Sequence, residues 1–198
     1  MAANNVTPFE IIAGPAKVYL APVGTAFPAV SDAEAGFNAS WIKLGHTDGG
    51  VKVMHAQTIV ALRTDQVTAP VKAVRSEEDL EISFSIVELT LENYATVLNQ
   101  GVAGPVDNGG NKTINNYRGG SGIETYALLV RGDQLSPYGA FNLQYEVPSV
   151  YQSAAPEVDF TKDAKALLAC TFTAIAAGAF IDGTVDADIF GVLRAGTA

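Results

Sequence analysis

The chain has 198 residues, of which 48% are apolar and 17% are charged, and its formal net charge is −9. This balance excludes a disordered chain, because disordered chains combine few apolar residues with many charges. The negative charge argues against nucleic-acid binding by phosphate neutralisation, which requires clustered lysine and arginine. The length suits one hydrophobic core, so we expect a single domain over residues 1–198.

The ends of the chain show no pattern of a targeting segment. Residues 1–12 lack a basic start followed by an apolar run, and no stretch reaches about 18 uninterrupted apolar residues. We therefore expect synthesis in a cytoplasm, without a signal peptide or a membrane span. Flexible arms are expected at about residues 1–12 and 195–198. Cys170 is the only cysteine, and its apolar surroundings in the sequence predict a small buried side chain.

Three segments alternate between apolar and polar residues, which predicts strands with one dry and one wet face. These segments are residues 80–86, 141–147 and 168–174. In the second of them, the alternation places Gln144 and Glu146 on the wet face. Further segments rich in β-forming residues predict strands at 16–20, 41–44, 51–62, 125–131 and 189–194. Clusters of Gly, Pro, Asn and Asp separate the strands, so we predict an all-β, antiparallel sandwich or barrel-like fold.

One short helix is expected to interrupt the strands. An apolar stripe with helical spacing consists of Leu91, Tyr94, Ala95 and Leu98. Thr90 is the expected N-cap, Glu92 suits the positive end of the helix dipole, and Gly101 is the expected terminator. Residues 22–40 and 101–122 lack periodicity, and we expect both to be long loops.

The groups that could carry chemistry have simpler structural explanations. His46 and His55 are nine residues apart with no cysteine nearby, so we expect surface histidines rather than a zinc site. No G-x-S-x-G motif is present, and Asp182, Asp186 and Asp188 lack the terminal glutamate of a calcium loop. The glycine-rich residues 118–122 lack the lysine of a phosphate-binding loop. We therefore predict no catalytic residue, no metal site and no cofactor.

An acidic cluster precedes the strand at residues 80–86. It consists of Glu77, Glu78, Asp79 and Glu81. Alternation along a strand sends neighbouring carboxylates to opposite faces, so the cluster does not form one acid-base or metal-binding group. We expect a solvated sheet edge, or a partner for lysine or arginine of a neighbouring molecule.

Three stretches of the chain carry a resemblance to a known family. Residues 74–99 combine the acidic entry, the alternating strand and the short helix, and residues 14–24 (GPAKVYLAPVG) and 41–51 (WIKLGHTDGGV) are β-rich segments that precede them. Together they resemble the major tail tube proteins of long-tailed, siphovirus-like bacteriophages, in which the two earlier stretches are similar to the opening strands. The three stretches occur in the expected order and cover about a third of the chain. The segment 101–122 has no assigned counterpart.

The resemblance implies a β-sandwich with a flanking helix, six copies of which close into a ring. Stacked rings form a tube that conducts the genome into the host, and DNA passes through without specific binding. A loop at about residues 51–75 would reach the neighbouring ring. The implied contact residues are Val51, His55, Arg63, Asp65, Arg75, Glu77 and Glu78. The implied partners are copies of the chain and the tail terminator, tape measure and distal tail proteins, in a virion tail assembled in the bacterial cytoplasm.

Two alternatives remain open at this point. The first is the tube protein of a contractile tail or of a secretion apparatus, which shares the implied fold. The second is a carbohydrate-binding β-sandwich, which would present several aromatic side chains on one open face. The aromatic candidates are Trp41, Tyr117, Tyr138 and Tyr151. An enzyme is not expected, because no site geometry can be proposed.

Overall fold

The computed structural model describes residues 12–99, 106–107, 109–114, 122–158, 160, 162–176 and 190–197. Eight strands form one antiparallel sheet in the order β2-β1-β7-β8-β9-β4-β3, with β10 also paired to β8. Their bounds are β1 Ala16–Pro22, β2 Ile42–Lys43, β3 Thr47–Thr64, β4 Val67–Ile86, β7 Tyr126–Gly132, β8 Leu143–Gln152, β9 Leu168–Ala174 and β10 Val192–Ala195. Together with the single short α-helix of the described chain, α1 (Leu91–Val97), these strands confirm the all-β prediction.

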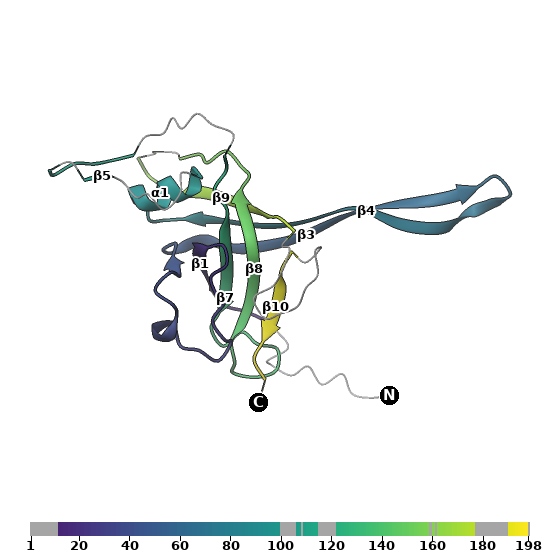
Figure 1. Cartoon of the computed structure of the whole chain (residues 1–198), viewed down its shortest axis with the longest axis horizontal. Coiled ribbons are helices and arrows are strands. Elements are labelled where there is room, and N and C mark those ends of the chain that lie inside the picture. The colour runs from purple at the N-terminus through teal and green to yellow at the C-terminus, as the bar shows by residue number, and fades with distance from the viewer. Residues whose placement is uncertain are drawn as a thin grey trace.

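The sheet folds over itself to enclose the main core (Figure 1). On one side of β8, residues 143–146 pair with β10 and residues 150–152 pair with β9. The core therefore joins side chains of β1 and β7 to side chains of β4 and β9, as in a β-sandwich. Phe84 and Phe172 stack at its centre with 5.9 Å between their ring centroids. The alternation predicted at 80–86 and 168–174 is confirmed, and Cys170 is buried.

Strands β1 and β7 are buried on both faces, which explains why their sequences do not alternate. Their second face packs against the segment 22–41 in a smaller cluster. Tyr19, Leu129 and Trp41 belong to this cluster, and Phe27 and Phe37 pack against it. The irregular segment predicted at 22–40 is confirmed, with a short 3-10 helix, η2 (Glu34–Gly36), within it.

The prediction of a wet face on β8 was wrong. Gln144 and Glu146 are buried, and the strand begins at Leu143 rather than at Phe141. Gln144 Nε2 donates hydrogen bonds to the Pro28 carbonyl at 2.9 Å and to Glu146 Oε1 at 2.6 Å. Arg194 Nε of β10 donates to Glu146 Oε2 at 3.0 Å. These partners come from segments distant in the sequence, and they allow polar side chains to be buried.

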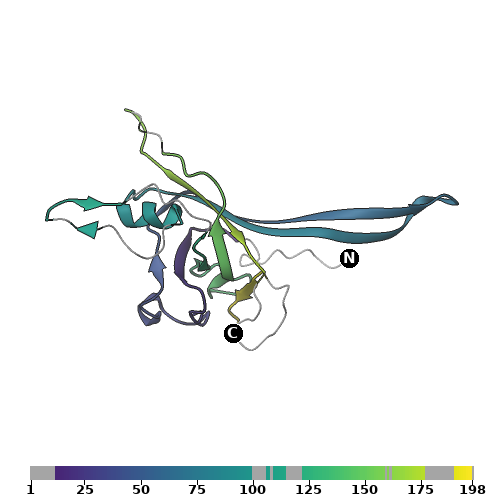
Figure 2. The same ribbon diagram turned by 45° about the horizontal axis from the view of Figure 1, so that its top comes forward.

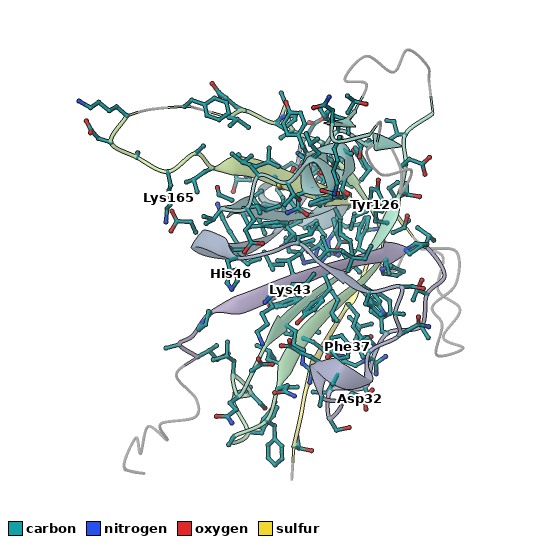
Figure 3. All side chains as sticks on the ribbon, turned by 90° about the vertical axis from the view of Figure 1, so that its left-hand side faces the viewer. Asp32, Phe37, Lys43, His46, Tyr126 and Lys165 are labelled. Atoms are coloured by element: carbon teal, nitrogen blue, oxygen red, sulfur yellow. The ribbon has the colours of Figure 1, made fainter. Side chains whose placement is uncertain are left out.

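Arg131 of β7 fastens the segment 22–41 to the sheet. Its side chain is buried, and its guanidinium donates to the carbonyl oxygens of Val30, at 3.2 Å, and of Asp32. The guanidinium also lies 5.0 Å from the ring centroid of Phe37. Figure 3 shows Asp32 and Phe37 close together beside the sheet. A charged residue at the end of an apolar strand therefore serves a structural purpose.

The helix forms as predicted at its N-terminus. Thr90 Oγ1 accepts a hydrogen bond from the Asn93 backbone N–H at 3.2 Å, so Thr90 is the N-cap. The helix ends at Val97, and the expected terminator Gly101 lies outside the described residues. Within the predicted loop 101–122, β5 (Val106–Asp107) pairs with β6 (Lys112–Thr113), so this segment contains a short hairpin.

The predicted C-terminal arm begins inside the sheet rather than after it. Ala195 is the last residue of β10. The Gly196 backbone N–H donates to the Asn142 carbonyl at 2.9 Å, and Ser136 Oγ donates to the Gly196 carbonyl at 2.6 Å. These bonds attach residues 195–196 to the body. Residues 1–11, which make up most of the predicted N-terminal arm, lie outside the described part of the chain.

An ion-pair network at the start of β1 makes stability depend on pH. Lys17 hydrogen-bonds Asp133, at 2.5 Å, and Glu34. The bond from Lys17 lowers the pKa of the Glu34 carboxyl. A lowered pKa in the folded state means that the stabilisation is present above the unfolded value of about 4.3 and is lost as the pH falls through the folded value. We expect Glu34→Gln to lower the melting temperature at pH 7, and the difference from the unmodified protein to vanish in acid.

Thermal unfolding at several pH values between neutral and acidic checks this expectation. Glu157→Gln is the matched control, because this substitution removes the same charge from an exposed position elsewhere in the chain. A difference between Glu34→Gln and the control that stays constant down to acidic pH would contradict the role assigned to the Lys17 pair.

Candidate assembly surface

Strands β3 and β4 continue far beyond the core as a two-stranded arm (Figures 1 and 2). The pairing runs without interruption by other elements from Thr47 opposite Ile86 to Thr64 opposite Val67. The core side chains end near Leu80, and we call residues 54–79 the arm. Every described residue of the arm except Glu78 is exposed. The segment expected to be an inter-ring loop, residues 51–75, therefore forms most of an ordered hairpin.

Local sequence features explain the path of this hairpin. Val, Ile and Thr favour extended backbone along both strands. A β-bulge at Gly49 and Gly50, with φ angles of 76° and 84°, bends β3 at the root of the hairpin, beside the core. A second bulge leaves Ser76 without a direct partner opposite Thr58 and Ile59. Pro70 lies close to the tip in a stretch without paired register positions, where a missing N–H does no harm.

The arm exposes large apolar side chains on both of its faces. Val60 and Val74 are directly opposite each other and share one face, and Ile59, which is 58% exposed, projects from the other. The full set of exposed large apolar side chains on the arm is Met54, Ile59, Val60, Leu62, Val67, Val71 and Val74. Seven large apolar side chains are thus exposed on one hairpin, and such groupings mark interaction surfaces. The arm is therefore the strongest candidate for an interaction surface in the described structure.

Polar contacts within the arm bring together three of the predicted contact residues. Glu78 Oε1 lies 2.5 Å from His55 Nε2, and Arg75 Nη1 donates to Glu78 Oε2 at 2.6 Å. The Arg75 guanidinium, followed by His55, lowers the pKa of the Glu78 carboxyl. Register places Glu77 on the opposite face, with a weak hydrogen bond of 3.4 Å from Thr58 Oγ1. The Glu78 carboxylate therefore already has two side-chain partners within its own chain.

The other predicted contact residues are spread along the hairpin. Val51 lies at its root and packs against the core, whereas Arg63 and Asp65 lie at its tip. Arg63 Nη1 donates to the Thr68 carbonyl across the tip. The prediction omitted the apolar side chains, which are the more prominent feature. The unbroken run at residues 59–62 could have revealed them, because a strand must place such a run on both faces.

A comparison with family models gives a match that covers most of the chain. A model described as "Phage tail tube protein" matches residues 1–183. The chain belongs to the phage tail tube protein family. This confirms the resemblance drawn from residues 14–24, 41–51 and 74–99. A comparison with curated proteins finds no match.

Membership gives the chain a structural role in the virion tail. A phage tail tube protein associates with copies of itself to form a tube and works with other proteins of the tail. The exposed arm of this tail tube protein is consistent with such self-association. None of the helices in the described residues is long and apolar enough to span a membrane.

The structure describes some of the residues that could have carried chemistry in this tail tube protein. The side chains of His46 and His55 are 77% and 57% exposed, which confirms that both are surface histidines. Across the part of the chain that the structure describes, no three His, Cys, Asp or Glu side chains are placed to hold a metal ion. Burial raises the pKa of Cys170 to about 12. Asp182, Asp186, Asp188 and residues 118–121 lie outside the described ranges.

The aromatic candidates that lie in the described part of the chain do not form the open platform expected of a carbohydrate-binding module. Trp41 is buried, and its Nε1 donates to the Ala26 carbonyl at 2.9 Å. Tyr151 is half-buried and Tyr138 is exposed, while Tyr117 lies outside the described residues. Trp41 of this tail tube protein therefore stabilises the segment 22–41 and is not available to stack on a sugar.

Proposed function

We propose that this tail tube protein forms hexameric rings that stack into the conduit through which the genome leaves the capsid of a non-contractile phage. The observation that carries the proposal is the arm, which exposes apolar side chains on both faces. A second copy of the chain would bury that surface, and an arm longer than the body's own strands can span the junction between rings. The number six rests on the resemblance to major tail tube proteins.

The sheet supports lateral association as well. Strands β2 and β3 are the two ends of the strand order, so each leaves one side without a neighbouring strand. Exposed edges invite uncontrolled pairing, and closure into a ring removes them. The contact residues proposed for stacking include Val51, His55, Arg63, Asp65, Arg75, Glu77 and Glu78. All of them lie on the β3–β4 hairpin.

The charge of the chain fits passage of DNA without retention. A net charge of −9 provides repulsion for phosphates if acidic residues line the channel. The role proposed is assembly without catalysis or cofactor. The tube would begin and end on other tail proteins, such as the distal tail protein and the tail terminator, and enclose the tape measure protein, with assembly in the bacterial cytoplasm.

Electron microscopy of the concentrated, purified protein tests the proposal. We expect rings and stacked tubes in negative stain, with six-fold symmetry in end-on class averages. A protein that sediments as a monomer at every concentration, and that is missing from purified virions, would contradict it. Binding of the tubes to a sheath protein would instead favour a contractile tail.

A further inference from the structure

We propose that the distal arm of one copy docks into an apolar groove between α1 and β2 of a second copy, at the end of the molecule opposite its own arm. We call residues 56–76 the distal arm. The inference rests on the proposed function, because it assumes that copies stack. It adds the surface that receives the arm.

The receiving groove is apolar and open. Its volume is about 390 Å³, and its apolar lining includes Leu20, Pro22, Ile42, Leu44, Ala95 and Tyr126. Ile42 is an apolar residue on the edge strand β2, and its side chain is 54% exposed. Polar side chains, among them Glu92 and Thr96 of α1, line the same groove. An apolar hollow with a polar border fits a cluster of aliphatic side chains from another protein chain.

The positions of arm and groove require contact between different copies. The arm leaves the body at one end, whereas α1 and β2 lie at the other end (Figures 1 and 2). Figure 3 views the molecule from that other end, where Lys43 of β2 and Tyr126 are seen. Because β3 and β4 stay paired along the arm, the distal arm cannot fold back to its own groove. Contact between unlike surfaces at opposite ends propagates from copy to copy, and it gives an open stack when the rotation between copies does not close a ring.

The distal arm and the rest of the chain have formal charges of opposite sign. Residues 56–76 contain three basic residues, Arg63, Lys72 and Arg75, and one acidic residue, Asp65, so their formal charge is +2. Because the whole chain carries −9, the remaining residues carry −11. Arg75 is paired with Glu78 of the same arm, so Arg63 and Lys72 near the tip are the cations that can attract the acidic body of a second copy. Charge therefore favours the body of a second copy over a second arm as the partner.

Register shows which side chains are available to enter the groove. Leu62 and Val67 lie at the tip and are exposed, and Lys72 is opposite Leu62. An aliphatic side chain would enter the apolar hollow, while the adjacent cation would face its polar border, where Glu92 lies. Glu92 is already paired with Lys112 at 2.8 Å, so the arm cation would join an existing ion pair. The apolar contact therefore provides the main attraction.

Disulfide trapping in assembled tubes tests this assignment. The double variant Leu62→Cys with Ile42→Cys carries one cysteine on the arm and one at the groove. Cys170 does not compete, because it is buried and its thiol has a raised pKa. We expect mild oxidation of tubes to give a ladder of covalent oligomers on non-reducing gels. Leu62 lies on β3, before the turn at the tip, and Val67 lies on β4, after it. The trapping is therefore repeated with Val67→Cys in place of Leu62→Cys, so that both sides of the tip are tested.

The control variant pairs Leu62→Cys with Leu193→Cys. Leu193 of β10 is 52% exposed but does not line the groove, so we expect no ladder from this variant. Three outcomes in tubes that are visible by microscopy would overturn the groove assignment and leave the proposed function standing. They are a ladder only with Leu193→Cys, a ladder with both the groove and the control positions, and a ladder with neither. Absence of tubes from the unmodified protein would overturn the proposed function itself.

Discussion

Replacing residues 58–77 by the dipeptide Asn-Gly is expected to abolish the stacking of rings into tubes and to leave a folded body. Gln57 and Glu78 are directly opposite each other in the hairpin, and Asn-Gly is the preferred two-residue turn between such positions. The deleted residues are all exposed and make no core contacts, so their removal deprives the body of no buried apolar surface. The measurements are negative-stain microscopy and sedimentation, with thermal unfolding to verify that the melting temperature changes by only a few degrees.

A conservative change on the same hairpin serves as the control for this truncation. Val71→Ile keeps the arm, its β-branched residues and its apolar surface, so tubes should form as before. Tubes that form normally from the truncated protein would show that the arm is dispensable for assembly. They would contradict the central step of the proposed function.

The largest expected effect on stability comes from Phe172→Ala. The Phe172 side chain is fully buried and stacks on Phe84 between the two layers of the sandwich. Truncation of such a side chain leaves a cavity and lowers the free energy of unfolding by about 3–5 kcal/mol. Urea unfolding followed by the fluorescence of Trp41 measures this change, because Trp41 is the only tryptophan and is buried.

Phe160→Ala provides the matched control, since the Phe160 side chain is 85% exposed. Its removal should change the free energy of unfolding by no more than about 0.5 kcal/mol. Equal effects of the two substitutions would mean that the interior identified around Phe172 does not hold the fold together. A change in the slope of the unfolding transition would indicate an altered denatured state and would call for a second core substitution.

The sequence predicted the strands well where one face alone is buried. Residues 80–86 and 168–174 alternate because one set of side chains enters the core and the other faces water. The same rule misassigned β8, where Gln144 and Glu146 are buried. Their partners are Pro28 and Arg194, which are distant along the chain, and no local pattern reveals such pairings. The burial of Gln144 and Glu146 therefore depends on tertiary contacts, and the alternation of residues along β8 does not predict it.

The hairpin shows a similar limit for the candidate site. The sequence predicted a strand at 51–62 and, through the resemblance, a loop at 51–75, but it did not predict paired strands of 18 and 20 residues. Strands in globular proteins are usually about 3–10 residues long, so length argued for an interruption. The proximity of His55, Arg75 and Glu78 depends on register across the bulge at Ser76. Residue spacing alone does not fix that register.

The arm also has a consequence for the protein before it is incorporated. Each newly folded subunit carries an adhesive surface that is exposed in its own structure, so premature polymerisation is a standing hazard. Repulsion between acidic bodies opposes it, whereas attraction between an arm and an acidic body favours it. Both weaken as the Debye length shortens from about 10 Å at 0.1 M salt to about 3 Å at 1 M, so at high salt the apolar contacts of the arm are the main force that joins free subunits.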